Sequence, residues 1–265
     1  MKTRVISAIV ALIIIIPIIF YGGLAFEIGV AIIGMIGLWE LLKLRESERK
    51  FPILIKVITF LSFLALVLLN TEYSDNFMLD YKVLALIIFL HLLPLVFYHD
   101  NKKYNITDAL FLVGSIFFLG IAFNFLITVR EFDLNYLIFL LLITIFTDTF
   151  AYITGMLIGR NKMIPSVSPK KTWEGFIGGT VFGVLISAAF YITTFNYTGN
   201  IFLLIFIVAL LSIIGQMGDL VFSSIKRHFK TKDFGNIMPG HGGVLDRLDS
   251  ILFVLLAFSF IMPYL

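Results

Sequence analysis

Long apolar runs recur along the whole chain, and short polar segments separate them. Each run is about 17–22 residues long, which is enough for a helix to cross a hydrocarbon layer roughly 30 Å thick. The first run follows Lys2 and Arg4, but it is longer than the apolar part of a signal peptide, so we expect it to be retained. The pattern predicts nine membrane-spanning helices, near residues 5–22, 24–43, 53–70, 82–98, 109–128, 136–158, 174–195, 201–221 and 250–265.

The composition agrees with this pattern. Of the 265 residues, 60% are hydrophobic and 14% are charged, whereas soluble domains carry roughly 25% charged residues. Too few charges are present to solvate the surface of one large soluble domain. The chain has no cysteine, which excludes disulfides, thiol catalysis and cysteine-bound metal. We therefore predict an all-α fold, a polytopic integral membrane helical bundle.

The basic residues predict the orientation of this bundle. With nine spans the connecting segments alternate between the two sides, and eighteen of the twenty Lys and Arg residues fall on the side of the N-terminus. Only Lys82 and Arg130 are left for the opposite side. Because cytosolic loops are enriched in Lys and Arg, the N-terminus and the segment 222–249 are expected in the cytosol.

Polar residues are unevenly distributed among the predicted spans. We divide the chain into residues 1–135, the N-terminal membrane helices of spans one to five, and residues 136–265, a C-terminal region of spans six to nine with two basic cytosolic loops, where we expect any catalysis to take place. Asp148 lies inside an apolar run, where an ionised carboxylate needs water, a cation or a partner; a functional role and polar packing are both open. Glu27 and Glu40 lie near helix ends, where they can reach the interface, and a structural role is expected for both. His91 is expected to be neutral and hydrogen-bonded to a neighbouring helix.

Asp219 begins a series of polar residues at the cytosolic end of the eighth predicted span. If the helix continues, five polar residues recur at spacings of three and four and share one face. They are Asp219, Ser223, Lys226, Arg227 and Lys230. A surface helix with salt bridges has a similar spacing, but here the other faces carry Leu, Val, Phe and Ile. We interpret the series as a carboxylate and a hydroxyl aligned with several cations.

The segment GHGGVLDRLD, residues 240–249, follows this series. Gly242 and Gly243 free the backbone to approach a ligand closely. Asp246 and Asp249 are three residues apart at the start of the last predicted helix, and Arg247 lies between them. Carboxylates in a first helical turn are also what a helix cap requires, so a capping role for one of the two is open.

These residue types together are suited to binding anions. Asp219 and Asp246 are hard oxygen ligands of the kind that hold Mg²⁺ when substrate phosphates complete its octahedron. Four cations can hold further phosphate oxygens: Lys226, Arg227, Lys232 and Arg247. A second basic segment, SPKKTWEG, offers Lys170 and Lys171, although a polybasic loop at the lipid surface has the same composition. The sequence has no Walker A loop, no dinucleotide glycine fingerprint and no HExxH motif.

These segments resemble one known family. The stretch SSIKRHFKTKDFGNIMPGHGGVLDRLD, residues 223–249, is similar to the signature of the phosphatidate cytidylyltransferases, also called CDP-diacylglycerol synthases. SPKKTWEG at 168–175, GDLVFSSIKR at 218–227 and the region 148–152 also resemble family segments. The resemblance is specific over roughly residues 145–250, and upstream it rests on span number and hydropathy.

The resemblance implies that CTP and phosphatidic acid react to give CDP-diacylglycerol and pyrophosphate, at the inner (cytoplasmic) membrane with the active site facing the cytosol. It implies Mg²⁺ as cofactor, and whether a second divalent or monovalent cation joins it stays open. The metal ligands would be Asp219 and Asp246, with Asp249 a ligand or a neighbour of one. Catalytic roles would fall on Asp219, Lys226, Arg227, Asp246 and Arg247. Substrate-binding roles would fall on Ser223, Lys232, His241, Gly242, Gly243, Lys170, Lys171 and Asp148.

The expected partners are the two substrates and the lipid bilayer, and no nucleic acid. Gly179 and Gly183 have the small-xxx-small spacing of close helix packing, and a homodimer is expected from this glycine-lined span and from the family. Two alternatives stay open: a membrane lipid-alcohol kinase that uses a triphosphate, and an ion-coupled secondary transporter. Transporter sites usually lie near the midplane in repeated halves, whereas here the polar groups gather at one face and the sequence shows no repeat.

Overall fold

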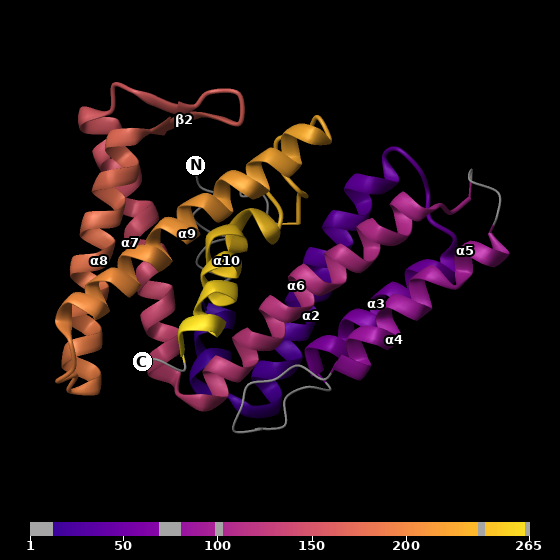
Figure 1. Ribbon diagram of the computed structural model, residues 1–265, viewed down its shortest axis with the longest axis horizontal. Helices are drawn as coiled ribbons and strands as arrows, with labels where there is room; N and C mark the ends of the chain where they lie inside the picture. The colour runs from indigo at the N-terminus through magenta and orange to yellow at the C-terminus, as the bar shows by residue number, and fades with distance from the viewer. Residues whose placement is uncertain (1–12, 69–80, 99–102, 238–241, 263–265) are drawn as a thin grey trace. The chain divides into compact units, whose positions relative to one another are not determined.

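The computed structural model describes residues 13–68, 81–98, 103–237 and 242–262. Within them, helix is found at each of the nine predicted apolar runs; of the first run, residues 13–21 are helical. Five of the described helices are long and apolar enough to cross a membrane, by length and composition. They are α2, Gly23–Glu46; α6, Ile106–Phe132; α7, Leu134–Ile158; α8, Trp173–Phe195; and α9, Ile201–His228 (Figure 1).

The other described helices are shorter. Besides the helical residues 13–21, they include α3, Ile53–Leu68; α4, Tyr81–Leu92; and α10, Leu245–Ile261. The helix α5 is a single turn at Pro94–Phe97. Proline has no N–H for the helical ladder and clashes with the preceding turn, so the fourth predicted span is divided at Pro94. Among the described residues, five of the predicted spans thus have the length and composition for a crossing.

The chain divides into two compact units. The first comprises residues 1–131 and 233–246, and the second residues 132–232 and 247–265. In the first unit α2 packs closely on its neighbours at Gly34, where an added Cβ would lie 2.7 Å from the Phe63 ring. Phe63 meets Phe123 of α6 edge to face, with ring centroids 6.2 Å apart. Both rings are fully buried, so this contact forms part of the core of the first unit.

The second unit contains a close contact between α7 and α8. A Cβ at Gly178 would lie 2.5 Å from Cγ2 of Thr154, and one at Gly179 would lie 2.6 Å from the carbonyl oxygen of Thr147. Gly183 likewise faces Thr147. The small-residue spacing predicted from the sequence therefore serves packing within one chain. This contact removes the glycines as an argument for a homodimer, which stays a prediction.

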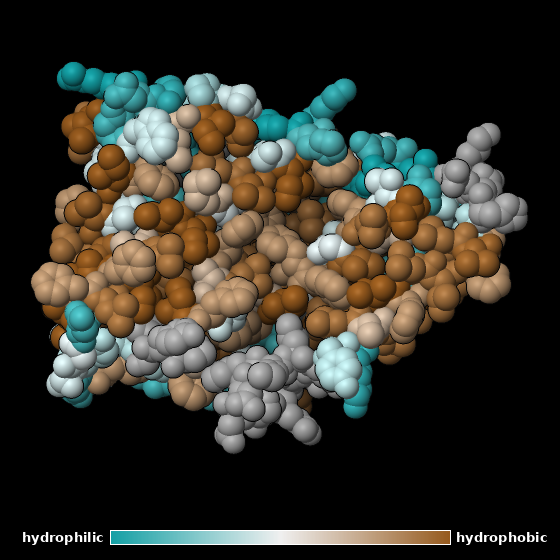
Figure 2. All heavy atoms as spheres, in the orientation of Figure 1, coloured by the Kyte–Doolittle hydropathy of each residue, from teal (hydrophilic) through white to brown (hydrophobic). Residues whose placement is uncertain are grey.

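A two-stranded hairpin joins α7 to α8, and the purely helical prediction did not include it. Strand β1, Lys162–Ile164, pairs antiparallel with β2, Ser168–Thr172. Thr172 ends β2 and also caps α8, because its hydroxyl accepts a hydrogen bond from the Gly175 amide at 3.1 Å. On the face shown in Figure 2, hydrophilic side chains gather around this hairpin, and mainly hydrophobic ones cover the helices of the second unit below it.

Candidate functional site

An ion pair joins the hairpin to α9 within the second unit. Nζ of Lys171 on β2 lies 2.8 Å from Oδ2 of Asp219 and donates a hydrogen bond to the Gln216 carbonyl at 3.0 Å. The two side chains are 26% and 31% exposed. The sequence assigned Lys171 and Asp219 to separate segments 48 residues apart. In the structure, Lys171 of the segment 168–175 contacts the carboxylate of Asp219, which begins the polar series on α9.

The predicted polar series on α9 is largely helical. Since α9 runs to His228, Asp219, Ser223 and Lys226 lie on one continuous helix, and the Ser223 hydroxyl donates to Asp219 Oδ1 at 3.4 Å. Lys226 is buried, with 8% exposure. Lys230 lies beyond the helix with φ +54°, and the Thr231 amide bonds back to the Lys226 carbonyl at 2.9 Å. This Schellman-type ending means that the prediction was wrong for Lys230.

Four further cations that were predicted to bind phosphate are exposed: Lys170, Arg227, Lys232 and Arg247. Arg227 in addition holds the hairpin. Nε of Arg227 donates to the Val167 carbonyl at 3.3 Å, and its Nη1 donates to the Thr231 carbonyl at 3.0 Å. Arg227 therefore ties the hairpin turn to the end of α9 and leaves part of its guanidinium exposed.

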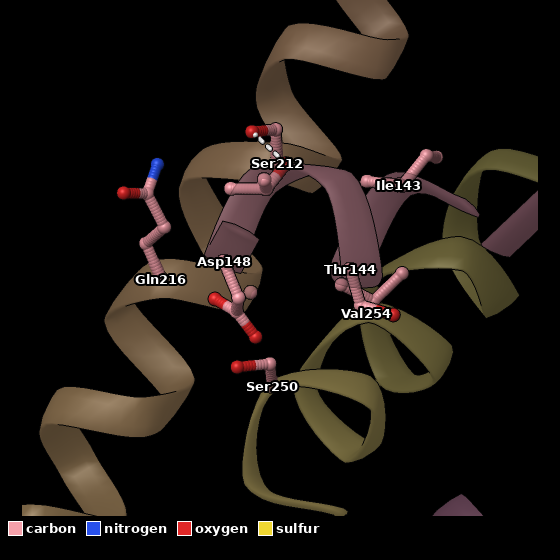
Figure 3. Close-up of a pocket in the computed structure, with 9 residues that line it drawn as sticks. Ile143, Thr144, Asp148, Ser212, Gln216, Ser250 and Val254 are labelled. Carbon is pink, nitrogen blue, oxygen red and sulfur yellow. Dashed lines mark hydrogen bonds between the residues drawn. The ribbon is translucent and has the colours of Figure 1, made fainter. Parts of the chain in front are cut away.

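Asp148 lines a small pocket between α7, α9 and α10 of the second unit. The walls of this pocket include Thr147, Ser212 and Ser250. The hydroxyl oxygens of Thr147 and Ser212 lie 2.8 Å apart. Figure 3 shows the Asp148 carboxylate directed toward the Ser250 hydroxyl, while the Gln216 amide points elsewhere. That amide donates to the Thr180 hydroxyl at 2.9 Å, so α8 is tied to the same wall.

The carboxylates of Asp148, Asp219 and Asp249 lie near enough to interact electrostatically. Lys171 acts on Asp148, and Lys226 acts on Asp249. Three acids and two lysines of the second unit therefore lie within electrostatic range of one another. In this arrangement the described residues include no group of three His, Cys, Asp or Glu side chains that would hold a metal by themselves.

This donor set still fits Mg²⁺. The ion usually keeps several waters and takes one or two protein carboxylates together with substrate phosphates. Asp219 and Asp249 are hard oxygen donors, Asp219 is partly exposed, and the lysines beside them can hold the phosphates that would share the ion. An ion held here would take further ligands from a phosphorylated substrate.

Asp246 belongs to the first unit, and there it ties together the segment before α10. Its Oδ2 accepts hydrogen bonds from the Phe234 amide at 2.8 Å and from the Gly243 amide at 2.9 Å. Gly242 has φ +87°, a conformation that favours glycine. These contacts support the capping role that the sequence left open. His241 lies outside the described residues, and a joint metal site of Asp246 with Asp219 stays a prediction.

Two other acidic or basic residues of the first unit have structural surroundings. Glu40 was expected within reach of the membrane interface, and that expectation was wrong, because Glu40 is fully buried and accepts backbone hydrogen bonds from Val244 and Leu245. Nothing in the sequence around Glu40 indicates this partner. The Nδ1 atom of His91 faces the Ile87 carbonyl at 2.8 Å, and its Nε2 faces the Thr59 hydroxyl at 3.1 Å. His91 is hydrogen-bonded to a neighbouring helix, as expected.

The fold defines a class of protein before any comparison: a multi-pass helical membrane protein, in which acids and lysines gather in the second unit. The chain matches the cytidylyltransferase family over residues 2–265, and it belongs to that family. It is 38% identical over 257 residues to the phosphatidate cytidylyltransferase of Staphylococcus haemolyticus, with 96% of each chain covered. The corresponding enzymes of Staphylococcus saprophyticus and Staphylococcus aureus are 37% and 38% identical, again over 96% of each chain. The resemblance seen in the sequence is confirmed.

Proposed function

We propose that the protein transfers the cytidylyl group of CTP to phosphatidic acid, which gives CDP-diacylglycerol and pyrophosphate. The family and the similar Staphylococcus enzymes support this function. The observation in the structure that carries it is the Lys171–Asp219 ion pair. This pair brings the two basic segments of the second unit together at one partly exposed carboxylate.

The reaction needs little acid–base catalysis, because the nucleophile is already an anion. A phosphate oxygen of phosphatidic acid forms a bond to the α-phosphorus of CTP, and the bond from that phosphorus to the bridging oxygen breaks. Pyrophosphate leaves with the electron pair. The difficulty is to bring two polyanions together, so fixed positive charge and positioning supply most of the catalysis.

The lysines and arginines would meet this need. Lys171 and Lys226 would bind substrate phosphates, because both lie beside carboxylates in the second unit and present ammonium groups to them. Arg227 and Arg247 would hold further phosphate oxygens through their planar N–H groups. Asp219 and Asp249 would hold Mg²⁺, and Asp246 stays a candidate ligand. When bound, the ion would neutralise developing charge on the phosphates.

The other candidates would help to bind substrate. Ser223 would donate to a phosphate oxygen in place of its long contact with Asp219. Lys170 and Lys232 are exposed and would attract the polyanion. Asp148 would influence the site through its charge. His241, Gly242 and Gly243 would form a turn that closely approaches a substrate phosphate.

We further propose how the protein is placed in the membrane. The proposal takes nine spans from the apolar runs, and it takes an N-terminus in the cytosol and an active site facing the cytosol from the distribution of Lys and Arg. The acyl chains of phosphatidic acid would stay in the inner membrane while its phosphate reaches the site. The chemistry would belong to residues 136–265, and a homodimer is the proposed assembly.

The test is an assay of the purified protein with CTP and phosphatidic acid across a Mg²⁺ titration. We expect labelled CDP-diacylglycerol to form, EDTA to abolish it, and Asp219→Asn to lose at least about a hundredfold in turnover, as is typical when one group that stabilises charge is removed. Asp133→Asn is the matched control, because Asp133 caps the start of α7, whereas the hairpin that carries Lys171 follows the other end of that helix. Phosphorylation of a prenol, or a protonophore-sensitive ion flux without CTP turnover, would contradict the proposal. Wild-type turnover in a folded Asp219→Asn variant would contradict the role of Asp219.

A further inference from the structure

Glu40 of α2 holds a segment more than two hundred residues later in the chain. Its Oε1 accepts a hydrogen bond from the Val244 amide at 2.9 Å, and its Oε2 accepts one from the Leu245 amide at 3.0 Å. Because α10 begins at Leu245, these amides belong to the helix start, where N–H groups have no acceptor within the helix. Glu40 of α2 therefore caps the start of α10 at Val244 and Leu245, which belong to the first unit as Glu40 does.

The backbone of this segment surrounds the Glu40 carboxylate on two sides. A Cβ added at Gly235 would lie 2.7 Å from Oε1 of Glu40. A Cβ added at Gly243 would collide with the same carboxylate. A side chain at either position would push the segment off the carboxylate, so the two glycines and Glu40 form one close-fitting contact.

Asp246 completes the arrangement. Through Phe234 and Gly243 it joins the two ends of the segment 233–246, while Glu40 connects the same segment to α2. Two carboxylates thus bind four backbone amides of a segment rich in glycine. Glycine loses more backbone freedom on ordering than other residues do, so a defined conformation here needs such anchors.

We propose that Glu40 is a positioning residue for cytidylyl transfer, which acts by fixing the backbone of residues 243–245. This inference rests on the proposed function, since the assigned roles of Gly242, Gly243 and Asp246 give the anchor a catalytic consequence. A substrate-binding turn that is held in advance loses less freedom when substrate binds. Glu40 itself contacts no substrate in this scheme.

The first test is Glu40→Gln in the full-length protein in lipid nanodiscs. Glutamine has nearly the same volume but places an NH₂ group where an acceptor is needed, so one backbone amide loses its partner. We expect amide hydrogen exchange in a peptide covering residues 242–249 to be at least about tenfold faster, and CTP turnover to fall at least about tenfold. Glu27→Gln, on the same helix and only half-buried, should change neither quantity. If Glu40 served packing alone, Glu40→Gln would likewise change neither the amide exchange nor the CTP turnover.

A second variant approaches the contact from the other side. Gly235→Ala should produce the same two effects, whereas Gly114→Ala, where an added Cβ has open space, should produce neither. Glu40→Gln and Gly235→Ala disrupt the same contact, so their effects on exchange and turnover should not add in full. The double variant should be close to the worse of the two single variants. Gly235→Ala also decides the question if Glu40→Gln does not fold.

The outcomes separate this inference from the proposed function. Faster exchange with unchanged turnover would show that Glu40 only stabilises the segment, and unchanged exchange would show that Glu40 is no anchor; either result overturns the inference. If the wild type forms no CDP-diacylglycerol, the proposed function fails first, and the exchange data still report whether Glu40 anchors residues 243–245.

Discussion

Replacing Lys171 by glutamine should reduce catalysis strongly and stability only slightly. Lys171 connects β2 to α9 through the Asp219 carboxylate and the Gln216 carbonyl. The substitution removes the positive charge but keeps a polar side chain that can reach the same region. A structural lysine and a substrate-binding lysine predict different results for this variant.

The structure sets the expected change in stability. The side chains of Lys171 and Asp219 are 26% and 31% exposed, and ion pairs accessible to water contribute about 0.2–1 kcal/mol. The Gln216 carbonyl lies inside α9, where the helical ladder already provides a donor. The free energy of unfolding should therefore fall by no more than about 1 kcal/mol.

The expected change in catalysis is larger. Removing one preorganised group that faces charge in a transition state typically lowers turnover by about 10²–10³-fold. Each factor of ten corresponds to about 1.4 kcal/mol, so we expect a loss of at least about 2.7 kcal/mol in transition-state stabilisation. That loss exceeds the effect on unfolding by more than a factor of two.

Two measurements on the same preparation check this prediction. Turnover is measured with saturating CTP and phosphatidic acid at several Mg²⁺ concentrations, and unfolding is followed by heating in detergent. Lys162→Gln is the matched control, because Lys162 is exposed on the partner strand of the same hairpin, and its turnover should stay within about twofold. If Lys171→Gln keeps turnover within threefold of the wild type, Lys171 has no role in the chemistry. If the free energy of unfolding instead falls by about 3 kcal/mol or more, the small stability change inferred from the exposure of the two side chains is wrong.

Two further substitutions test the packing of each unit. Asp108→Asn should lower the free energy of unfolding by about 3–5 kcal/mol, because Asp108 is fully buried and pairs with Arg45 at 2.9 Å and Arg49 at 3.2 Å. Thermal unfolding measures this change, and a loss below about 1 kcal/mol would contradict the prediction. Gly179→Ala should lower stability by about 1–3 kcal/mol through overpacking of α7 on α8. Gly114→Ala is the control in both measurements and should be neutral or slightly stabilising.

The sequence predicted the positions of the helices better than their ends. Hydropathy locates apolar runs, but a helix continues wherever backbone hydrogen bonds and propensity allow. The eighth predicted span ended at residue 221, whereas α9 continues to His228 through residues that are polar but compatible with helix. The hairpin β1–β2 was not predicted, because its strands are short and lack the alternation of apolar and polar residues that marks a half-buried strand. Its two strands contain Met163, Ile164 and the sequence SPKKT.

Contacts between distant segments could not be predicted from spacing. Helical periodicity placed Asp219 and Ser223 on one face, and their contact in α9 is observed. The pairing of Lys171 with Asp219, and of Glu40 with Val244, depends on how helices and loops pack in three dimensions. The only sequence signal for Glu40 was a carboxylate near the end of an apolar helix, which is equally compatible with an exposed position at the interface.

Exposure separates the acids that maintain the fold from those suited to chemistry. Glu40 and Asp108 are fully buried, and their partners are backbone amides or guanidinium groups that cannot leave without opening a unit. Asp219 is partly exposed, and its partner is a lysine whose flexible stem lets the ammonium group move. A phosphate can compete for that lysine, and a cation for that carboxylate, at the loss of one ion pair worth about 1 kcal/mol or less. Breaking the contacts of Asp108 would require several kcal/mol. Ligand binding is therefore expected at Asp219, although all three residues are acids in or beside apolar helices.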